Sequence, residues 1–308
     1  MRIGFGLGTA TSGGGAGRRS SAKAGGEWFG QLVDALERHG FDSLWLSERV
    51  TGAAVDPVVG LAVAAGRTAR LKLGFSVLVL PGRNPVLLAK ELASLDFLSG
   101  GRLLPAFGLG VVDRGEQQAF GVAREERAAR FDEALPLLRR LWSGEPVDHE
   151  GRFFSFAGVR VQPAPVQQPF EVWLGGRAPS ELRRVGRLGD GWLPSFCTVE
   201  DVVAGRAVVE SAASDAGRAI DPEHWGALVV YAPDGDSLPE RLSALLAARR
   251  PDVDPSDVVP RGVGALRKHL ERFVDAGFSK FVVVPAVDPA LWDDEVASLA
   301  AEVLPLQG

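Results

Sequence analysis

The sequence contains very little sulfur, since its 308 residues include one cysteine, Cys197, and one methionine. A single cysteine excludes an internal disulfide, and this usage is typical of a protein that stays in a reducing compartment, here the cytoplasm. The four histidines, His39, His149, His224 and His269, are far apart and form no spaced cluster with cysteine or carboxylates. The sequence therefore predicts no metal site.

Long hydrophobic runs are also missing. No stretch approaches the roughly 18 consecutive apolar residues of a membrane-spanning helix, and the N-terminus is too poor in apolar residues for a signal peptide. The net charge of −5 lacks the basic excess that binding to nucleic acid usually requires. With 46% hydrophobic and 24% charged residues, the chain has the composition of a soluble globular protein with a large core.

The sequence does contain a regular alternation of short apolar segments and longer helical patterns. The predicted strands are 2–7, 42–47, 71–80, 102–110, 171–174, 190–193, 225–231 and 279–284. The predicted helices are 27–40, 57–69, 85–99, 115–120, 124–142, 179–188, 199–216, 237–249, 263–276 and 289–303.

This alternation favours a closed parallel barrel. Eight predicted strands are each followed by a helix, and strands such as FVVVPA are apolar without alternation, as strands covered on both faces should be. The expected fold class is α/β, a (β/α)8 TIM barrel. Neither G-x-G-x-x-G nor the P-loop motif occurs, so the Rossmann and P-loop interpretations lack their main signal.

Two segments depart from the alternation. Residues 9–26 are rich in glycine and serine, which predicts a flexible loop. Residues 144–169 contain β-forming residues and turns but no helical pattern, which predicts a short β-hairpin inserted after the fourth helix of the barrel. Apart from these two segments, residues 1–308 are expected to form a single barrel domain.

A candidate anion site follows the fifth predicted strand. Gly175 and Gly176 end this strand, Arg177 follows, and Pro179 is suited to the first turn of a helix. Free N–H groups at such a helix start, near Ala178, attract an anion and above all a phosphate. An ordinary turn between strand and helix also fits these residues.

The segment VWLGGRAPSELRRVGRLGDGWLP, residues 172–194, resembles the phosphate loop of the luciferase-like monooxygenase superfamily. It is most similar to the branch that uses the deazaflavin coenzyme F420, and residues 73–110, 120–156 and 263–285 extend the resemblance. The resemblance implies a coenzyme that lies across the carboxyl end of the barrel. The implied cofactor-binding residues are Ser76, Val77, Gly108, Gly110, Gly175, Gly176, Arg177 and Ala178, with a non-prolyl cis peptide bond at Ser76-Val77.

The implied catalytic residues differ from the family pattern. Members of the family tend to carry an acidic residue followed by histidine after the second strand, and this chain has Glu48 and Arg49. Arginine stays protonated and donates to anions, but it is a poor acid–base catalyst. Either Glu48 transfers a proton, or water supplies it, or Arg49 binds an acidic substrate or the coenzyme. A structural ion pair between Glu48 and Arg49 fits equally, and Asp113 and Glu116 are expected to be solvated.

The resemblance implies an F420-dependent oxidoreductase that transfers a hydride to or from a small organic substrate. Two alternatives remain open, a monooxygenase that uses FMN and O2 and a protein that binds a deazaflavin without turnover. The expected partner is a small molecule, with no nucleic acid and no membrane. Apolar residues on the predicted helix 85–99 are consistent with a homodimer.

Overall fold

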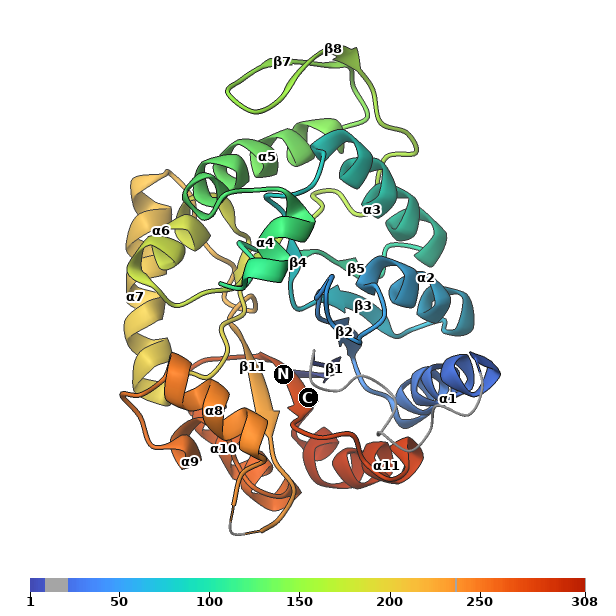
Figure 1. Ribbon diagram of the computed structural model, residues 1–308, viewed down its shortest axis with the longest axis vertical. Coiled ribbons are helices and arrows are strands. Elements are labelled where there is room, and N and C mark those ends of the chain that lie inside the picture. Colours follow the sequence, from blue (N-terminus) through green and yellow to red (C-terminus); the bar gives the residue numbers. More distant parts are fainter. Residues whose placement is uncertain (9–21, 236, 308) are drawn as a thin grey trace.

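Short parallel strands form the centre of the computed structural model, and helices surround them (Figure 1). The structure describes residues 1–8, 22–235 and 237–307. Within these ranges, the strands of the central sheet are β1 (Arg2–Leu7), β2 (Ser43–Leu46), β3 (Lys72–Phe75), β4 (Leu78–Val79), β5 (Leu103–Leu104), β6 (Ala106–Gly108), β9 (Trp173–Leu174), β10 (Gly191–Trp192), β11 (Gly226–Tyr231) and β12 (Lys280–Pro285).

The strands close into a barrel. One sheet has the order β11-β12-β1-β2-β3-β5 and the other has the order β10-β9-β6-β4. The two sheets are continuous on one side because β3 and β4 are parts of one predicted strand, as are β5 and β6. Parallel bridges from Trp192 to Trp225 and from Ser195 to Leu228 join them on the other side. The described residues thus supply eight parallel strand positions, which confirms the predicted TIM barrel.

The helices surround the barrel strands. They are α1 (Ala22–His39), α2 (Pro57–Arg67), α3 (Pro85–Ser99), α4 (Arg114–Phe120), α5 (Arg127–Leu141), α6 (Pro179–Leu188), α7 (Val199–Asp215), α8 (Glu240–Arg249), α9 (Pro255–Val258), α10 (Val263–Asp275) and α11 (Trp292–Val303), with 3-10 turns at Arg124–Glu126 and Leu304–Leu306. Asp56 and Asn84 cap α2 and α3, and each is followed by a proline at the first helical position. Within the described ranges, no helix has the length and hydrophobicity needed to cross a membrane.

The predicted hairpin is confirmed. The strands β7 (Val147–Glu150) and β8 (Ser155–Val159) pair antiparallel and follow α5, the fourth helix position of the barrel. Most of the loop predicted over 9–26 lies outside the described residues. Its last part was wrong, since α1 already begins at Ala22; the alanines and lysine at 22–24 are good helix formers and extend the helix toward the N-terminus.

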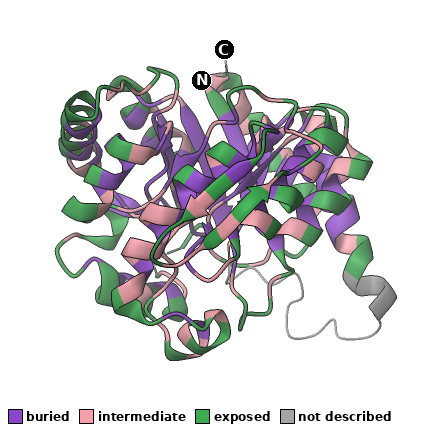
Figure 2. Cartoon of the chain, turned by 90° about the horizontal axis from the view of Figure 1, so that it is seen from above, coloured by how far each residue is buried: buried purple, intermediate pink, exposed green. Residues whose placement is uncertain are grey.

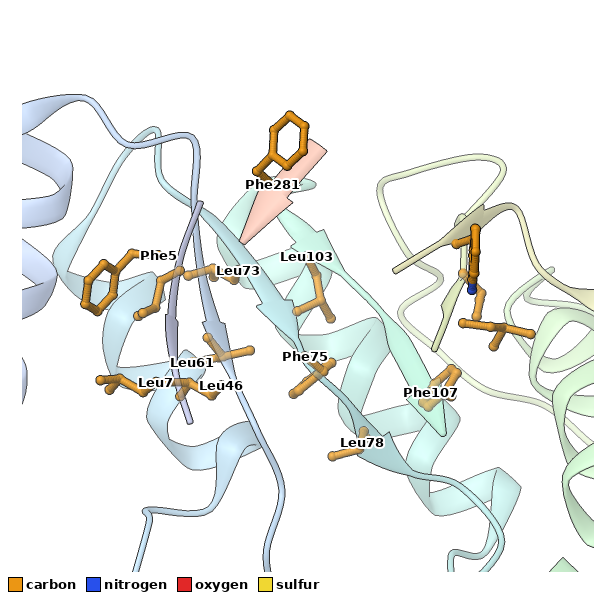
Figure 3. Close-up of a cluster of buried hydrophobic side chains, with 14 of the residues drawn as sticks. Phe5, Leu7, Leu46, Leu61, Leu73, Phe75, Leu78, Leu103, Phe107 and Phe281 are labelled. Atoms are coloured by element: carbon orange, nitrogen blue, oxygen red, sulfur yellow. The ribbon is translucent and has the colours of Figure 1, made fainter. Parts of the chain in front are cut away.

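Buried residues occupy the interior, where the central strands lie between the helices (Figure 2). Outward-facing strand side chains such as Phe5, Phe75 and Phe107 pack in the layer beneath the helices (Figure 3). A second cluster includes Trp45 from β2 and Trp173 from β9. A Cβ atom at Gly191 would lie 2.6 Å from the Trp173 ring, so glycine there makes room for the indole.

Leu87, Phe97 and Leu98 remain exposed on α3, the helix on which a homodimer contact was expected. The functionally informative part of the molecule lies elsewhere, at the barrel end where the carboxyl ends of the strands and their following loops meet. We refer to this end as the mouth. In TIM barrels the ligand-binding residues occupy this end, because the loops after the strands vary while the barrel supports them.

Candidate active site

Three predicted cofactor-binding residues form one patch at the mouth. Val77, Gly108 and Gly175 lie at the ends of neighbouring strands, since β4 pairs with β6 and β6 with β9. A Cβ atom built on Gly108 would lie 2.5 Å from Val77 Cγ2, and one on Gly175 would lie 3.5 Å from Val77 Cγ1. The structure therefore brings together residues separated by up to 98 positions, and their side of the mouth is small and apolar.

The reasons why glycine is needed differ among the glycines in and beside this patch. At Gly108 a methyl group would overlap the Val77 side chain, and Gly110 has a positive φ of 82° that other residues rarely adopt. At Gly175 the nearest atoms to a built Cβ are Val77 Cγ1 at 3.5 Å and the Leu193 carbonyl oxygen at 3.6 Å, which are ordinary contacts. Packing explains Gly108 and backbone conformation explains Gly110, whereas the protein leaves room for a side chain at Gly175.

The peptide bond between Ser76 and Val77 is cis, as the resemblance implied. It separates β3 from β4 and interrupts the predicted strand 71–80. The Ser76 amide donates to the Leu46 carbonyl at 2.9 Å, and the Ser47 hydroxyl donates to the Ser76 carbonyl at 2.9 Å. We call Ser76 and Val77, which lie between β3 and β4, the bulge, and these bonds attach it to the end of β2.

Glu48 holds the residues that follow the bulge in place. Its carboxylate accepts a hydrogen bond from the Val79 amide at 2.6 Å and pairs with the Arg83 guanidinium. The Glu48 side chain is only 2% exposed. Burial raises the pKa of Glu48, and this outweighs the opposing effects of Arg83 and of the Val79 amide. The contacts of Glu48 are those of a residue that positions the Ser76–Val79 segment.

Arg49 does not pair with Glu48. Its guanidinium lies 3.6 Å from an Asp113 carboxylate oxygen and 3.5 Å from Glu116 Oε1. Each of the two residues therefore has other partners, and the simple Glu48–Arg49 ion pair considered from the sequence is wrong. Arg49 projects from the end of β2 with 30% of its side chain exposed.

The expectation that Glu116 is solvated is also wrong. Glu116 is 3% exposed and accepts hydrogen bonds from the Thr51 amide at 2.8 Å and from the Val50 amide at 3.3 Å. Burial opposes its charge, but the hydrogen bonds from Thr51 and Val50 and the nearby Arg49 hold the pKa of Glu116 below its ordinary value. Glu116 thus ties the loop after β2 to α4, while Asp113 caps that helix.

In the predicted anion-binding loop, some of the amides already donate hydrogen bonds to another residue of the protein. The amides of Arg177 and Ala178 both donate to Glu181 Oε2 at 3.0 Å. This carboxylate occupies the position at the start of α6 where a bound phosphate was expected. The Gly176 amide, by contrast, makes no hydrogen bond among the described residues, and Gly176 has a φ of 101°. The loop can therefore offer one amide and the Arg177 guanidinium to an anion while Glu181 stays in place.

Titratable histidines are absent from the described part of the mouth. His39 ends α1, His149 lies in the hairpin, His224 precedes β11 and His269 lies in α10. Burial, and then the Arg272 cation, lower the pKa of His269 to about 4, so its imidazole is neutral at physiological pH.

Two residues at the mouth were not predicted. Arg83 follows the third strand position in the turn LPGRNP, and a charged residue in a loop at the carboxyl end of a barrel strand was a signal that could have identified it. Arg249 ends α8, and the Arg177 guanidinium donates to the Arg249 carbonyl at 2.6 Å. Arg177 and Arg249 are 72 positions apart, so no local pattern in the sequence could have linked them.

The match to a known family agrees with this geometry. Residues 6–258 match the sequence model of the family described as luciferase-like monooxygenase, and the chain belongs to this family. An F420-dependent glucose-6-phosphate dehydrogenase from Kineococcus radiotolerans is 34% identical over 186 residues, which cover 56% of this chain and 54% of that protein. A phthiodiolone/phenolphthiodiolone dimycocerosates ketoreductase from Mycobacterium kansasii is 35% identical over 160 residues, which cover 51% and 43%. The chain thus spans about half the length of the curated relatives it matches.

Solved structures extend the likeness to the whole chain. The monooxygenase RslO1 from Streptomyces bottropensis superposes with a TM-score of 0.78 at 25% identity and covers 100% of both chains. An F420-dependent secondary alcohol dehydrogenase, solved with an F420–acetone adduct, has a TM-score of 0.78 at 18% identity and covers 100% of this chain and 99% of its own. At that identity the second likeness shows the shared fold alone.

Proposed function

We propose that this protein is an F420-dependent oxidoreductase that transfers a hydride to or from a small organic substrate. The family membership and the F420-dependent relative from Kineococcus radiotolerans support this proposal. The structural observation that carries it is Gly175. A glycine that protein packing does not require, beside Val77 at the mouth, fits a site where a coenzyme approaches the backbone.

The residues at the mouth fit such a coenzyme. Val77, Gly108 and Gly175 offer a small apolar surface to a planar ring, and Gly176 and Arg177 offer an amide and a guanidinium to a phosphate. When bound, the deazaflavin supplies or accepts the hydride. The protein contributes binding and orientation, because these residues lie on strand ends that the barrel holds in place.

In this proposal, neither Glu48 nor Arg49 acts as the acid or base that transfers the proton. Glu48 is held by Arg83 and the Val79 amide, and arginine, the residue at position 49, is a poor acid–base catalyst. With no histidine in the described part of the mouth, we infer that water exchanges the proton and that Arg49 donates hydrogen bonds to the substrate. The roles of Ser76, Gly110 and Ala178 are then structural, since they shape the bulge and the loops around the ring.

An FMN-dependent monooxygenase is the second candidate function. Its support is RslO1, a monooxygenase that covers all of this chain at 25% identity. Both functions would use the same apolar patch, because deazaflavin and flavin rings are planar and similar in size. The difference lies in the redox partner, O2 in one case and an organic substrate in the other.

Binding of the two coenzymes separates the candidates. Purified protein is titrated with F420 and, separately, with FMN, and the dissociation constants are measured by fluorescence. We expect F420 to bind at least about 10-fold more tightly than FMN, a difference of about 1.4 kcal/mol. Tight binding of FMN alone would reject the proposal. Tight binding of F420 without turnover of any alcohol, ketone or enone in a broad panel would favour the non-catalytic alternative.

Removing the charge of Glu181 is expected to strengthen coenzyme binding. Glu181→Gln keeps an oxygen that can accept from the Arg177 and Ala178 amides, but it removes the negative charge from the start of α6. We expect the dissociation constant for F420 to fall about 3-fold, the size of a partly exposed charge effect at a helix start. Glu200→Gln, which removes an exposed carboxylate from the first turn of α7, is the control. Equal affinities of Glu181→Gln and the wild type would show that the phosphate lies away from α6.

A further inference from the structure

A buried arginine holds the loop that follows β6 at the mouth, residues 109–112. Arg127 is the first residue of α5 and is only 8% exposed. Its Nη1 atom lies 3.4 Å from the Leu109 carbonyl oxygen, 3.3 Å from that of Gly110 and 2.9 Å from that of Val111. Three consecutive carbonyl groups therefore point toward one guanidinium nitrogen.

The direction of these carbonyl groups also fixes the direction of the amides in the same three peptide units. In a trans peptide unit the N–H group points away from the C=O group, and none of the cis bonds among the described residues lies in this loop. The N–H groups of Gly110, Val111 and Val112 thus point away from Arg127. Gly110 has a φ of 82°, a turn conformation that side chains disfavour.

These three amides are free donors. In the part of the chain that the structure describes, none of them donates a hydrogen bond to another group. Gly110 and Val111 are partly exposed and Val112 is 68% exposed, so the side of the loop opposite Arg127 is open to a ligand. Successive backbone N–H groups on one side of a turn attract a negatively charged oxygen.

Along the chain, the free amides lie between the apolar patch and Arg49. Gly108 of the patch comes directly before the loop. A Cβ atom built on Gly110 would lie 3.0 Å from Val79 Cγ1, so the loop packs against the strand that follows the bulge. At the other end of the loop, a carboxylate oxygen of Asp113 lies 3.6 Å from the Arg49 guanidinium. The amides thus connect the surface proposed for the coenzyme ring with the arginine proposed to donate to the substrate.

We propose that Arg127 is a positioning residue, and that the amides of Gly110, Val111 and Val112 donate hydrogen bonds to the substrate oxygen on the carbon that exchanges the hydride, a role that rests on the proposed function. When a carbonyl carbon accepts the hydride, the coenzyme is oxidised, the C=O π electrons move to the oxygen, and water then supplies the proton that completes the alcohol. Donors fixed at that oxygen stabilise its negative charge as the charge develops. The substrate class is therefore a ketone or an aldehyde, or the corresponding alcohol.

The amide signals in an NMR spectrum test these donors before the substrate is known. Protein labelled with [15N]valine is titrated with sodium acetate, whose carboxylate stands in for the charged substrate oxygen, with and without saturating F420. Val111→Ile, Val112→Ile and Val274→Ile assign three of the signals, and Val274 on α10 is the internal reference. We expect the signals of Val111 and Val112 to move as acetate binds, at saturating F420 as well, and that of Val274 to stay.

Three arginine variants test the positioning role. We expect Arg127→Met to weaken acetate binding about 10-fold, because the amides lose the contact that orients them toward the charged oxygen. Arg127→Lys keeps a charged donor beside the carbonyl oxygens and should restore most of the affinity. Arg130→Met should leave it unchanged and is the matched control, since Arg130 is a partly buried arginine of α5 that pairs with Glu126 and lies over the Phe153 ring.

The results separate the substrate site from the coenzyme. Signals of Val111 and Val112 that do not move in the wild type overturn the donor role, even where a variant fails to fold. Equal acetate affinity in the wild type and in Arg127→Met, with the fold checked by circular dichroism, overturns the positioning role. Displacement of acetate by F420 assigns the amides to the coenzyme and overturns the substrate role. If F420 does not bind but acetate binding still depends on Arg127, the proposed coenzyme fails and the oxygen-binding amides stand.

Discussion

Replacing Glu48 with alanine is expected to lower the free energy of unfolding by about 3 kcal/mol. The substitution leaves the Arg83 guanidinium, which is 20% exposed, without its main carboxylate, and it leaves the Val79 amide without its acceptor. Arg83 is already incompletely bonded, since its Nε atom is buried without a hydrogen-bond partner among the described residues. A partly buried cation left with only the Glu91 carboxylate, 4.0 Å away, and an unpaired amide each cost free energy.

Urea unfolding followed by tryptophan fluorescence measures this loss. The double variant Glu48→Ala/Arg83→Met serves as the control, because it removes both charges and should recover part of the stability that the single variant loses. A free energy of unfolding for the single variant within about 0.5 kcal/mol of the wild type, the range of a neutral surface change, would contradict the positioning role. We also expect Glu48→Ala to weaken F420 binding, because Glu48 supports the segment that carries Val77.

The barrel could be predicted from the sequence because its signal is repeated. Parallel strands buried on both faces leave short apolar runs, and each is followed by a helix with its own start and stop residues. What failed was local detail. The strand predicted over 71–80 is split at the cis bond after Ser76, and the short helix Pro255–Val258 has too few residues to show a period.

The site was less predictable, because its contacts are made across the barrel. The glycine-rich loop and the adjacent residues Glu48 and Arg49 are local patterns, so the sequence alone could suggest them as candidates. The partners of these residues come from elsewhere in the sequence, with Arg83 beside Glu48 and Glu116 beside Arg49. Besides the position of Arg83 in a loop after a barrel strand, Glu181 also had an overlooked local signal, since a glutamate three residues after a helix cap often bonds back to the cap.

Gly175→Ala is expected to weaken F420 binding by about 10- to 100-fold without lowering the stability of the fold. The added methyl group would make only ordinary contacts with Val77 and with the Leu193 carbonyl, so the protein itself can accept it. A ligand packed against the Gly175 backbone cannot accept it, because overpacking a tight contact by one methyl group costs about 1–3 kcal/mol. Fluorescence titration and urea unfolding measure the two quantities separately.

Two further glycine-to-alanine variants serve as controls for the effect of Gly175→Ala on coenzyme binding and on stability. Gly108→Ala places a methyl group 2.5 Å from Val77 Cγ2, so we expect it to lower the stability as well as the affinity. Gly264→Ala lies on α10 with nothing within 4 Å of the added atom, so it should leave F420 binding unchanged. Wild-type affinity in Gly175→Ala would mean that no coenzyme contacts this backbone, and the proposed function would then lose the structural observation that carries it. A loss of affinity in Gly175→Ala at wild-type stability has one physical explanation here, a ligand that occupies the space the glycine leaves.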